Sequence, residues 1–289
     1  MSVANMLRRV AIAALMVSAT ALLPGTAQDG TAAPRKITAP ACNRAQFRIM
    51  VDVGHSKEVP GAVSARGIDE YDFNLRLGRR VERQLVAKGF SRAVLMITDG
   101  RAQSSLAKRI TRANDAKADL FLSIHHDSVP ETFMNMWTYE GKSRRYSDRF
   151  PGHSIFVSAD NPQYKLSLLF ASMIGNEMRA RGLHYTPHYI EKFMGERRHE
   201  LLDAEAGVYR YDRLAVLMFT HMPAVLLEAG MIVHRAEEVA LASPERQALI
   251  ASAVTDAVEL YCQLKQVRWP DTAERPPATG EAARVAKKK

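Results

Sequence analysis

Short apolar segments alternate with amphipathic helical patterns through the middle of this 289-residue chain. The apolar segments are expected as strands at residues 47–53, 93–98, 120–125, 154–158 and 224–230. Hydrophobic positions recur at helical spacing over residues 69–89, 104–118, 164–182 and 243–264. Strands that are apolar throughout need cover on both faces. The predicted fold class is therefore α/β: a single three-layer domain with a mostly parallel twisted sheet and helices on both faces.

Residues at the expected helix ends agree with this alternation. Asp69 is placed to cap the first helix, and Ser243, which a proline follows, is placed to cap the last. In the second helix, Leu106, Ile110 and Ala113 are expected to form one inward face. The pattern thus predicts both where the helices begin and which side chains they bury.

The first 27 residues differ from this domain. They combine a basic start, an apolar run that is short for a membrane span, and small residues that end at Ala27. This order is typical of a secretory signal peptide at residues 1–27. The alternative is an uncleaved membrane anchor. We expect an exported protein, periplasmic or secreted, that meets the membrane only through its transient signal peptide.

Composition defines the remaining segments. Residues 28–43 are rich in Ala, Pro and Thr and are interpreted as a linker, residues 44–266 as the catalytic domain, and residues 267–289 as a disordered basic tail. The net charge of +9 favours anionic surroundings. Because export argues against nucleic acid, an acidic wall or membrane surface is the better match, with simple solubility as the alternative.

The chain has two cysteines, Cys42 before the first strand and Cys262 near the end of the last helix. An oxidising compartment would permit a disulfide between them. Two free thiols are the alternative, and the spacing is unlike that of a metal site.

Four groups that bind metals or move protons lie at one predicted edge of the sheet. His55, His125 and Glu228 follow or end apolar strands, and Glu70 opens the helix after the His55 loop. Ligands bind at the carboxyl ends of parallel strands. Two imidazoles and one carboxylate form a catalytic zinc site, and a further carboxylate can act as general base. We predict one Zn²⁺ per chain, held by His55, Glu70 and His125, with Glu228 as the base.

Each of these residues also has a structural interpretation, such as capping a turn or pairing with a basic side chain. Their joint placement favours the metal site, because four independent coincidences would otherwise be needed. Strand alternation points His126 away from His125. It is therefore a candidate for substrate contact or a packed histidine rather than a ligand.

The motifs around these residues resemble a known family. "VDVGH", "GAVSARGIDEYDFNL", "RITRANDAKADLFLSIHHDS" and "MPAVLLEAG" occur in family order from Ile49 to about Gly230. In this respect the chain resembles the zinc-dependent N-acetylmuramoyl-L-alanine amidases of the amidase-3 type. The resemblance implies a peptidoglycan hydrolase that cleaves the amide between N-acetylmuramic acid and L-alanine of the stem peptide. It assigns the same ligands and the same catalytic glutamate. Asn114, like His126, is a further candidate for substrate contact.

The resemblance also implies the partners. Peptidoglycan or muropeptides are the expected substrates, a protein activator is a further candidate, and the chain is expected to be a monomer. The stretch at residues 184–213 looks longer than a minimal family member needs. It is interpreted either as a regulatory flap or as a surface elaboration. Two other functions stay open: a zinc peptidase or deacetylase acting on wall fragments, and a peptidoglycan-binding scaffold without activity.

Overall fold

The computed structural model describes residues 42–268. Residues 1–41 and 269–289 lie outside the described part of the chain. The predicted signal peptide, most of the predicted linker and residues 269–289 of the predicted tail therefore lie outside it. Among the helices of the described part, none is long and apolar enough to span a bilayer.

A seven-stranded sheet in the order β2-β1-β3-β9-β6-β8-β7 forms the centre of the domain. The strands are β1 (Arg48–Val53), β2 (Arg92–Met96), β3 (Leu120–Asp127), β6 (Ser154–Val157), β7 (Glu200–Asp203), β8 (Val208–Arg210) and β9 (Ala224–Met231). Strands β2, β1, β3 and β9 are mutually parallel. β6 runs antiparallel to β9, and β7 runs antiparallel to β8. The prediction of a mostly parallel sheet is confirmed, although β7 and β8 were not foreseen.

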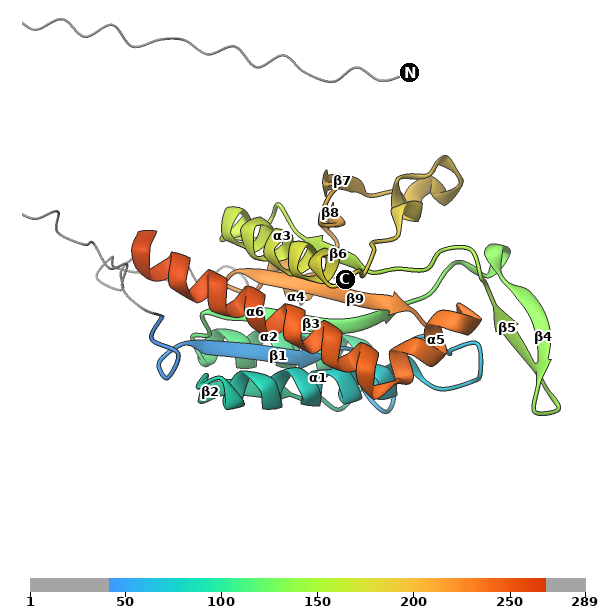
Figure 1. The fold of residues 1–289 in the computed structure, drawn as a ribbon, viewed down its shortest axis with the longest axis horizontal. Coiled ribbons are helices and arrows are strands. Elements are labelled where there is room, and N and C mark those ends of the chain that lie inside the picture. Colours follow the sequence, from blue (N-terminus) through green and yellow to red (C-terminus); the bar gives the residue numbers. More distant parts are fainter. Residues whose placement is uncertain (1–41, 269–289) are drawn as a thin grey trace, which may run out of the picture. The chain divides into compact units, whose positions relative to one another are not determined.

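Helices cover both faces of this sheet, as Figure 1 shows. They are α1 (Glu70–Ala87), α2 (Ala102–Asp115), α3 (Tyr164–Ala180), α4 (Ala215–Met218), α5 (Arg235–Ala242) and α6 (Pro244–Arg268). The predicted caps differ in outcome. Ser243 Oγ accepts the backbone N–H of Arg246, whereas the Asp69 side chain caps no N–H of α1. The helix α6 extends to Arg268, beyond the expected domain boundary at residue 266.

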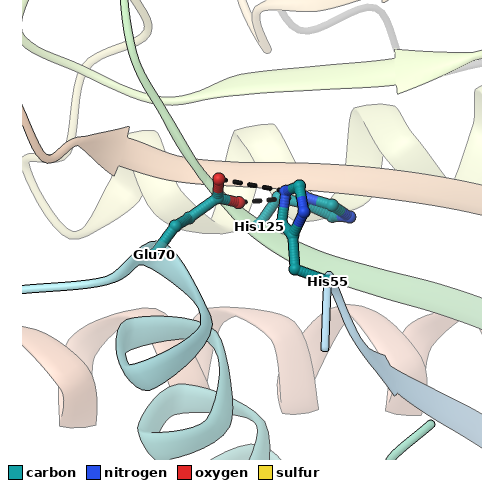
Figure 2. Close-up of side chains that lie close together, drawn as sticks. All are labelled: His55, Glu70 and His125. Carbon is teal, nitrogen blue, oxygen red and sulfur yellow. Dashed lines mark hydrogen bonds and ion pairs between the residues drawn. The ribbon is translucent and has the colours of Figure 1, made fainter. Parts of the chain in front are cut away.

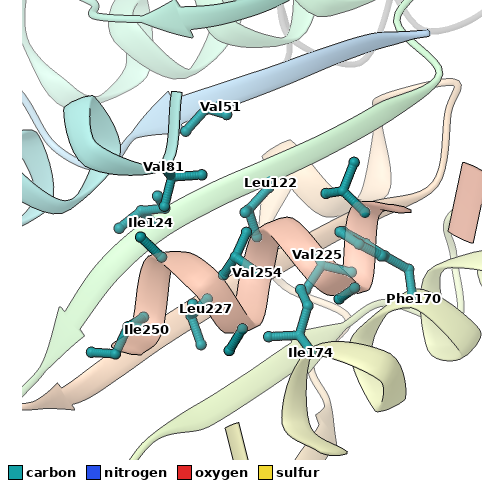
Figure 3. Close-up of a cluster of buried hydrophobic side chains, with 14 of the residues drawn as sticks. Val51, Val81, Leu122, Ile124, Phe170, Ile174, Val225, Leu227, Ile250 and Val254 are labelled. Atoms are coloured by element: carbon teal, nitrogen blue, oxygen red, sulfur yellow. The ribbon is translucent and has the colours of Figure 1, made fainter. Parts of the chain in front are cut away.

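The larger hydrophobic core lies between the sheet and the helices α1, α3 and α6. Leu122 and Ile124 of β3 face it and pack with Val254 of α6 and Phe170 of α3 (Figure 3). A smaller cluster on the opposite face contains Met50 of β1 and residues of α2 and α4. Successive residues of each strand point to opposite faces, so β1 and β3 supply side chains to both layers.

A second sheet consists only of the hairpin β4 (Asn135–Tyr139) and β5 (Lys142–Tyr146), which Figure 1 shows projecting from the domain. The indole N–H of Trp137 donates to the carbonyl of Ala65, and Arg235 stacks 3.9 Å from the centre of the Tyr146 ring. These contacts attach the hairpin to the domain near the start of α1. The sequence pattern did not predict it.

A disulfide joins Cys42 to Cys262. It connects the segment before β1 to α6. The Cys262 side chain is buried in the larger core, against which Cys42 packs.

Candidate active site

Three potential metal ligands converge at the carboxyl ends of β1 and β3 (Figure 2). His55 follows β1, His125 lies near the end of β3, and Glu70 is the first residue of α1. His55 Nε2 lies 3.0 Å from one carboxylate oxygen of Glu70, and His125 Nδ1 lies 3.0 Å from the other. The sequence-predicted ligands are thus brought together from three separate elements.

The donor set fits a zinc ion. One ligand atom from each residue can be chosen so that all three lie within 4.8 Å of one another. Zinc binds imidazole nitrogen and carboxylate oxygen at about 2.0–2.2 Å, and a catalytic site uses three protein ligands with a fourth position open. Two histidines and one glutamate supply this set.

Two glycines make room for the ligands. A Cβ on Gly54 would come within 2.3 Å of His125 Nε2. A Cβ on Gly61, whose φ is 85°, would come within 2.3 Å of Glu70 Oε2 and 2.7 Å of the His55 ring. Side chains at these positions would displace the donor groups, so these glycines are part of the site.

Glu70 remains a carboxylate in this environment. Burial by itself would raise its pKa, but hydrogen bonds to His125 and His55 hold the pKa well below the usual value. The backbone N–H of Ala62 also donates to Oε2 at 3.0 Å. Such contacts fix the orientation of a ligand as well as its charge.

His126 points to the opposite side of β3, as strand alternation predicts. It is 3 % exposed, its Nδ1 lies 2.7 Å from Asn74 Oδ1, and burial lowers its pKa to about 3. Asn74 also donates to Glu70 Oε1 at 3.1 Å. These contacts tie His126 to a ligand rather than to the surface and give no support to its predicted contact with substrate.

Asn114 also has internal partners. Its amide donates to the carbonyl of Phe219, and its oxygen accepts the backbone N–H of His221. These bonds hold the α4 end against α2. The predicted role of Asn114 in substrate binding therefore gains no support from its contacts and stays a prediction.

Glu228 lies beside the ligands. In the parallel register of β3 and β9 it is the partner of His125, which places both on the same sheet face. Its buried Oε2 has no hydrogen-bond partner among the described residues. Burial, together with the negative charges of Asp127 and Glu70, raises the pKa of Glu228 well above the usual value. An unpaired carboxylate with a raised pKa next to a metal site has the properties of a general base.

A neighbouring pair, Asp127 and Tyr189, borders Glu228. The Tyr189 hydroxyl lies 2.8 and 3.0 Å from the two carboxylate oxygens of Asp127. Burial raises the pKa of Asp127 to about 7 despite this hydrogen bond. The register of β3 and β9 shifts between His125 and Asp127, and such irregularities re-aim side chains beside active sites. Sequence reasoning missed this pair because Tyr189 comes from the 184–213 stretch.

The glutamates of that stretch lie away from the metal ligands. Glu200 pairs with Arg210, and Glu205 pairs with Arg179. Glu191 and Glu196 are exposed. None of the four belongs to the ligand cluster found in the described residues. In this structure the stretch instead supplies Tyr189 to the wall of the site.

The profile of the amidase-3 family, N-acetylmuramoyl-L-alanine amidase, matches residues 49–260. The chain belongs to this family. AmiC of Neisseria meningitidis is 26% identical over 225 residues, which cover 74% of this chain and 52% of AmiC, so the chain spans about half the length of that relative.

Solved amidase structures share the fold. The catalytic domain of CwlV from Bacillus (Paenibacillus) polymyxa var. colistinus matches with a TM-score of 0.54 and 24% identity, covering 74% of this chain and 97% of that one. The CwlD amidase of Clostridioides difficile matches with a TM-score of 0.54 and 18% identity, covering 75% and 99%. The family match places this chain among the N-acetylmuramoyl-L-alanine amidases, which act on peptidoglycan. The residues of the site are consistent with that activity.

Proposed function

We propose that this amidase is an exported zinc enzyme that hydrolyses the amide between N-acetylmuramic acid and L-alanine. The observation that carries this proposal is the convergence of His55, Glu70 and His125, with Glu228 beside them in register with His125. The site lies at the carboxyl ends of parallel strands, where ligands bind in such sheets. Family membership supplies the substrate class.

The residues of the site divide into two groups: His55, Glu70 and His125 would hold the metal ion, and Glu228 would carry the proton. A zinc ion, when bound, would polarise the scissile carbonyl and make water more acidic. Glu228 would take the proton of the attacking water and transfer it to the nitrogen of the departing L-alanine. Its raised pKa suits both steps, because the residue must first accept a proton and then donate it.

The raised pKa of Glu228 sets the expected pH dependence. Glu228 works as a base only when ionised, and burial raises its pKa first, followed by the charges of Asp127 and Glu70. The rate is therefore expected to fall as the pH decreases through this raised pKa. We expect the acid limb at a higher pH than the pKa of an exposed glutamate, as measured from kcat/KM between pH 4 and pH 8.

Export and partners are further parts of the proposal. The basic and apolar start of the chain supports a signal peptide, and an extracytoplasmic location agrees with the disulfide. The CwlD amidase was solved in complex with the GerS lipoprotein. By analogy, we propose a protein activator for this chain, with the amidase itself a monomer.

Product analysis tests the reaction. The purified protein is incubated with sacculi, and the soluble products are identified by mass spectrometry together with the zinc content of the protein. We expect stem peptides with a free N-terminal L-alanine and one zinc per chain. Release of acetate, or cuts within the peptide, would instead indicate a deacetylase or peptidase.

A pair of variants completes this test. Glu228→Gln is expected to lower the rate by about 10²- to 10⁴-fold with zinc content unchanged, because only the proton carrier is lost. Glu200→Gln, an exposed glutamate on β7, is the matched control and is expected to keep the parent rate. Equal lysis by parent and Glu228→Gln would contradict a catalytic role and favour a binding scaffold.

A further inference from the structure

We propose that Arg109 is a positioning residue for the metal centre, an inference that rests on the proposed zinc site. Arg109 lies in α2 and is buried, with its side chain 3% exposed. Nη1 donates to Asp52 Oδ1 and to the carbonyl of Val53, each at 2.6 Å. Nη2 donates to the carbonyl of His55. One guanidinium therefore binds three points of the segment that presents the first ligand.

This segment needs to be held. His55 has a φ of 66°, in the left-handed region that residues other than glycine disfavour. Gly54 cannot be replaced without striking the ring of His125. The chain must therefore turn sharply after β1 through a conformation that its own residues do not favour.

Gly54 and the carbonyls on either side of it have hydrogen-bond partners in this turn. The N–H of Gly54 donates to the carbonyl of Ile124 at 2.9 Å. Its carbonyl accepts the amide of Asn74, from α1, at 3.2 Å. The carbonyls on either side, those of Val53 and His55, are bound by Arg109 from the opposite face of the sheet. Asn74 and Arg109 thus hold the turn from two sides.

The His55 ring depends on this backbone for its position. Its side chain is 29% exposed, and its polar contact with another side chain is that of Nε2 with Glu70, itself a ligand. His125, by contrast, lies within β3 and is paired with Glu228 of the neighbouring strand β9. A shift of the turn would move His55 away from the other two donors, so Arg109 acts on metal geometry through the backbone.

The energetics agree with positioning rather than stability alone. Asp52 and Arg109 form a buried ion pair, with side chains 1% and 3% exposed. Such a pair is often no more stabilising than well-packed apolar residues of similar volume. Here the Asp52 carboxylate also accepts a hydrogen bond from Ser123 Oγ at 2.7 Å. It anchors the Arg109 guanidinium, which also donates to the carbonyls of Val53 and His55. Both residues line a cavity of about 160 Å³ that His55 and His125 also line.

The test compares two lysine variants of the same helix. Arg109→Lys keeps the charge but loses the planar fork that binds several acceptors at once. Arg112→Lys is the matched control, because Arg112 is exposed and its Nη1 donates to the carbonyl of Ile97. The zinc Kd of each full-length protein is measured by competition with a chelator, and apo-protein Tm is recorded alongside.

We expect Arg109→Lys to weaken zinc binding by about tenfold or more, as loss of ligand-orienting contacts typically does. Its His55 imidazole signals in NMR spectra should shift or broaden in the apo protein. Arg112→Lys should match the parent in both readouts. A variant with a lower Tm but the parent's zinc Kd and His55 signals would show a structural role only and overturn the proposal.

A second variant guards against misfolding. Asp52→Asn removes the anchoring charge but retains the shape of the side chain, and we expect a smaller loss of zinc affinity than for Arg109→Lys. If Arg109→Lys does not fold, an unchanged zinc Kd in Asp52→Asn overturns the inference. Absence of zinc binding by the parent protein would instead refute the proposed function, so the two failures are distinguishable.

Discussion

On the face covered by α1, α3 and α6, β3 contributes Leu122 and Ile124 to a closed aliphatic core. On the other face, the same strand contributes Ser123, His125 and Asp127, each of which contacts or adjoins an ionisable group. The helices of that second face include α4, which has only four residues. The comparison teaches that one strand serves stability on one side and chemistry on the other.

The difference has a physical basis. Apolar burial stabilises at about 25 cal/mol per Å² without any directional requirement. Buried charges such as Asp52 and Glu228 need specific partners or a bound ligand, and they add little to stability. Changes on the core face should therefore alter stability with little effect on zinc affinity, whereas changes on the site face should do the reverse.

Removing the disulfide should give the largest effect on stability. The bond spans 220 residues, and a cross-link of that length is expected to contribute about 5 kcal/mol through the entropy of the unfolded chain. The double variant Cys42→Ser, Cys262→Ala is expected to unfold at lower denaturant concentration but to bind zinc like the parent. The parent protein in reducing agent lacks the same bond and should unfold at the same denaturant concentration as the variant. Equal unfolding midpoints for the variant and the oxidised parent would refute the effect.

Neighbouring residues of β3 offer a sharper comparison. Leu122→Ala should cost about 3 kcal/mol of unfolding free energy, because it leaves a cavity in the larger core. Ser123→Ala removes one hydrogen bond to Asp52 and should cost about 1 kcal/mol. Only the serine variant should weaken zinc binding. If Leu122→Ala weakens it equally, the two faces are not independent.

The smallest expected effect concerns pH. Burial raises the pKa of Asp127 to about 7 in the folded protein, above its value of 3.8 when exposed, so ionisation opposes folding as the pH rises between these values. Asp127→Asn removes this opposition and retains an acceptor for Tyr189. In the apo protein, the variant's stability relative to the parent should grow by about 1 kcal/mol from pH 5 to pH 6. A constant difference would contradict the raised pKa.

The α/β fold could be predicted from the sequence because its signals are local, and the same holds for the three candidate ligands and Glu228. Apolar runs mark the strands, and polar residues at strand ends mark the edge where sites form. The α2 pattern shows where this reasoning stopped. Leu106, expected to point inward, is 37% exposed, whereas Arg109 is buried at 2%. The spacing of apolar residues predicts that a helix has a buried face. It does not predict which polar groups of other segments that face will contact.

The sequence by itself determined the alternation of strands and helices, the candidate ligands and the candidate catalytic glutamate, because hydrophobic periodicity and residue chemistry can be read along the chain. Only the tertiary structure decided which side chains support them. Arg109 meets Asp52 across 57 residues, and Tyr189 meets Asp127 across 62. Such contacts arise when distant segments pack together, and their geometry leaves no periodic trace in either segment.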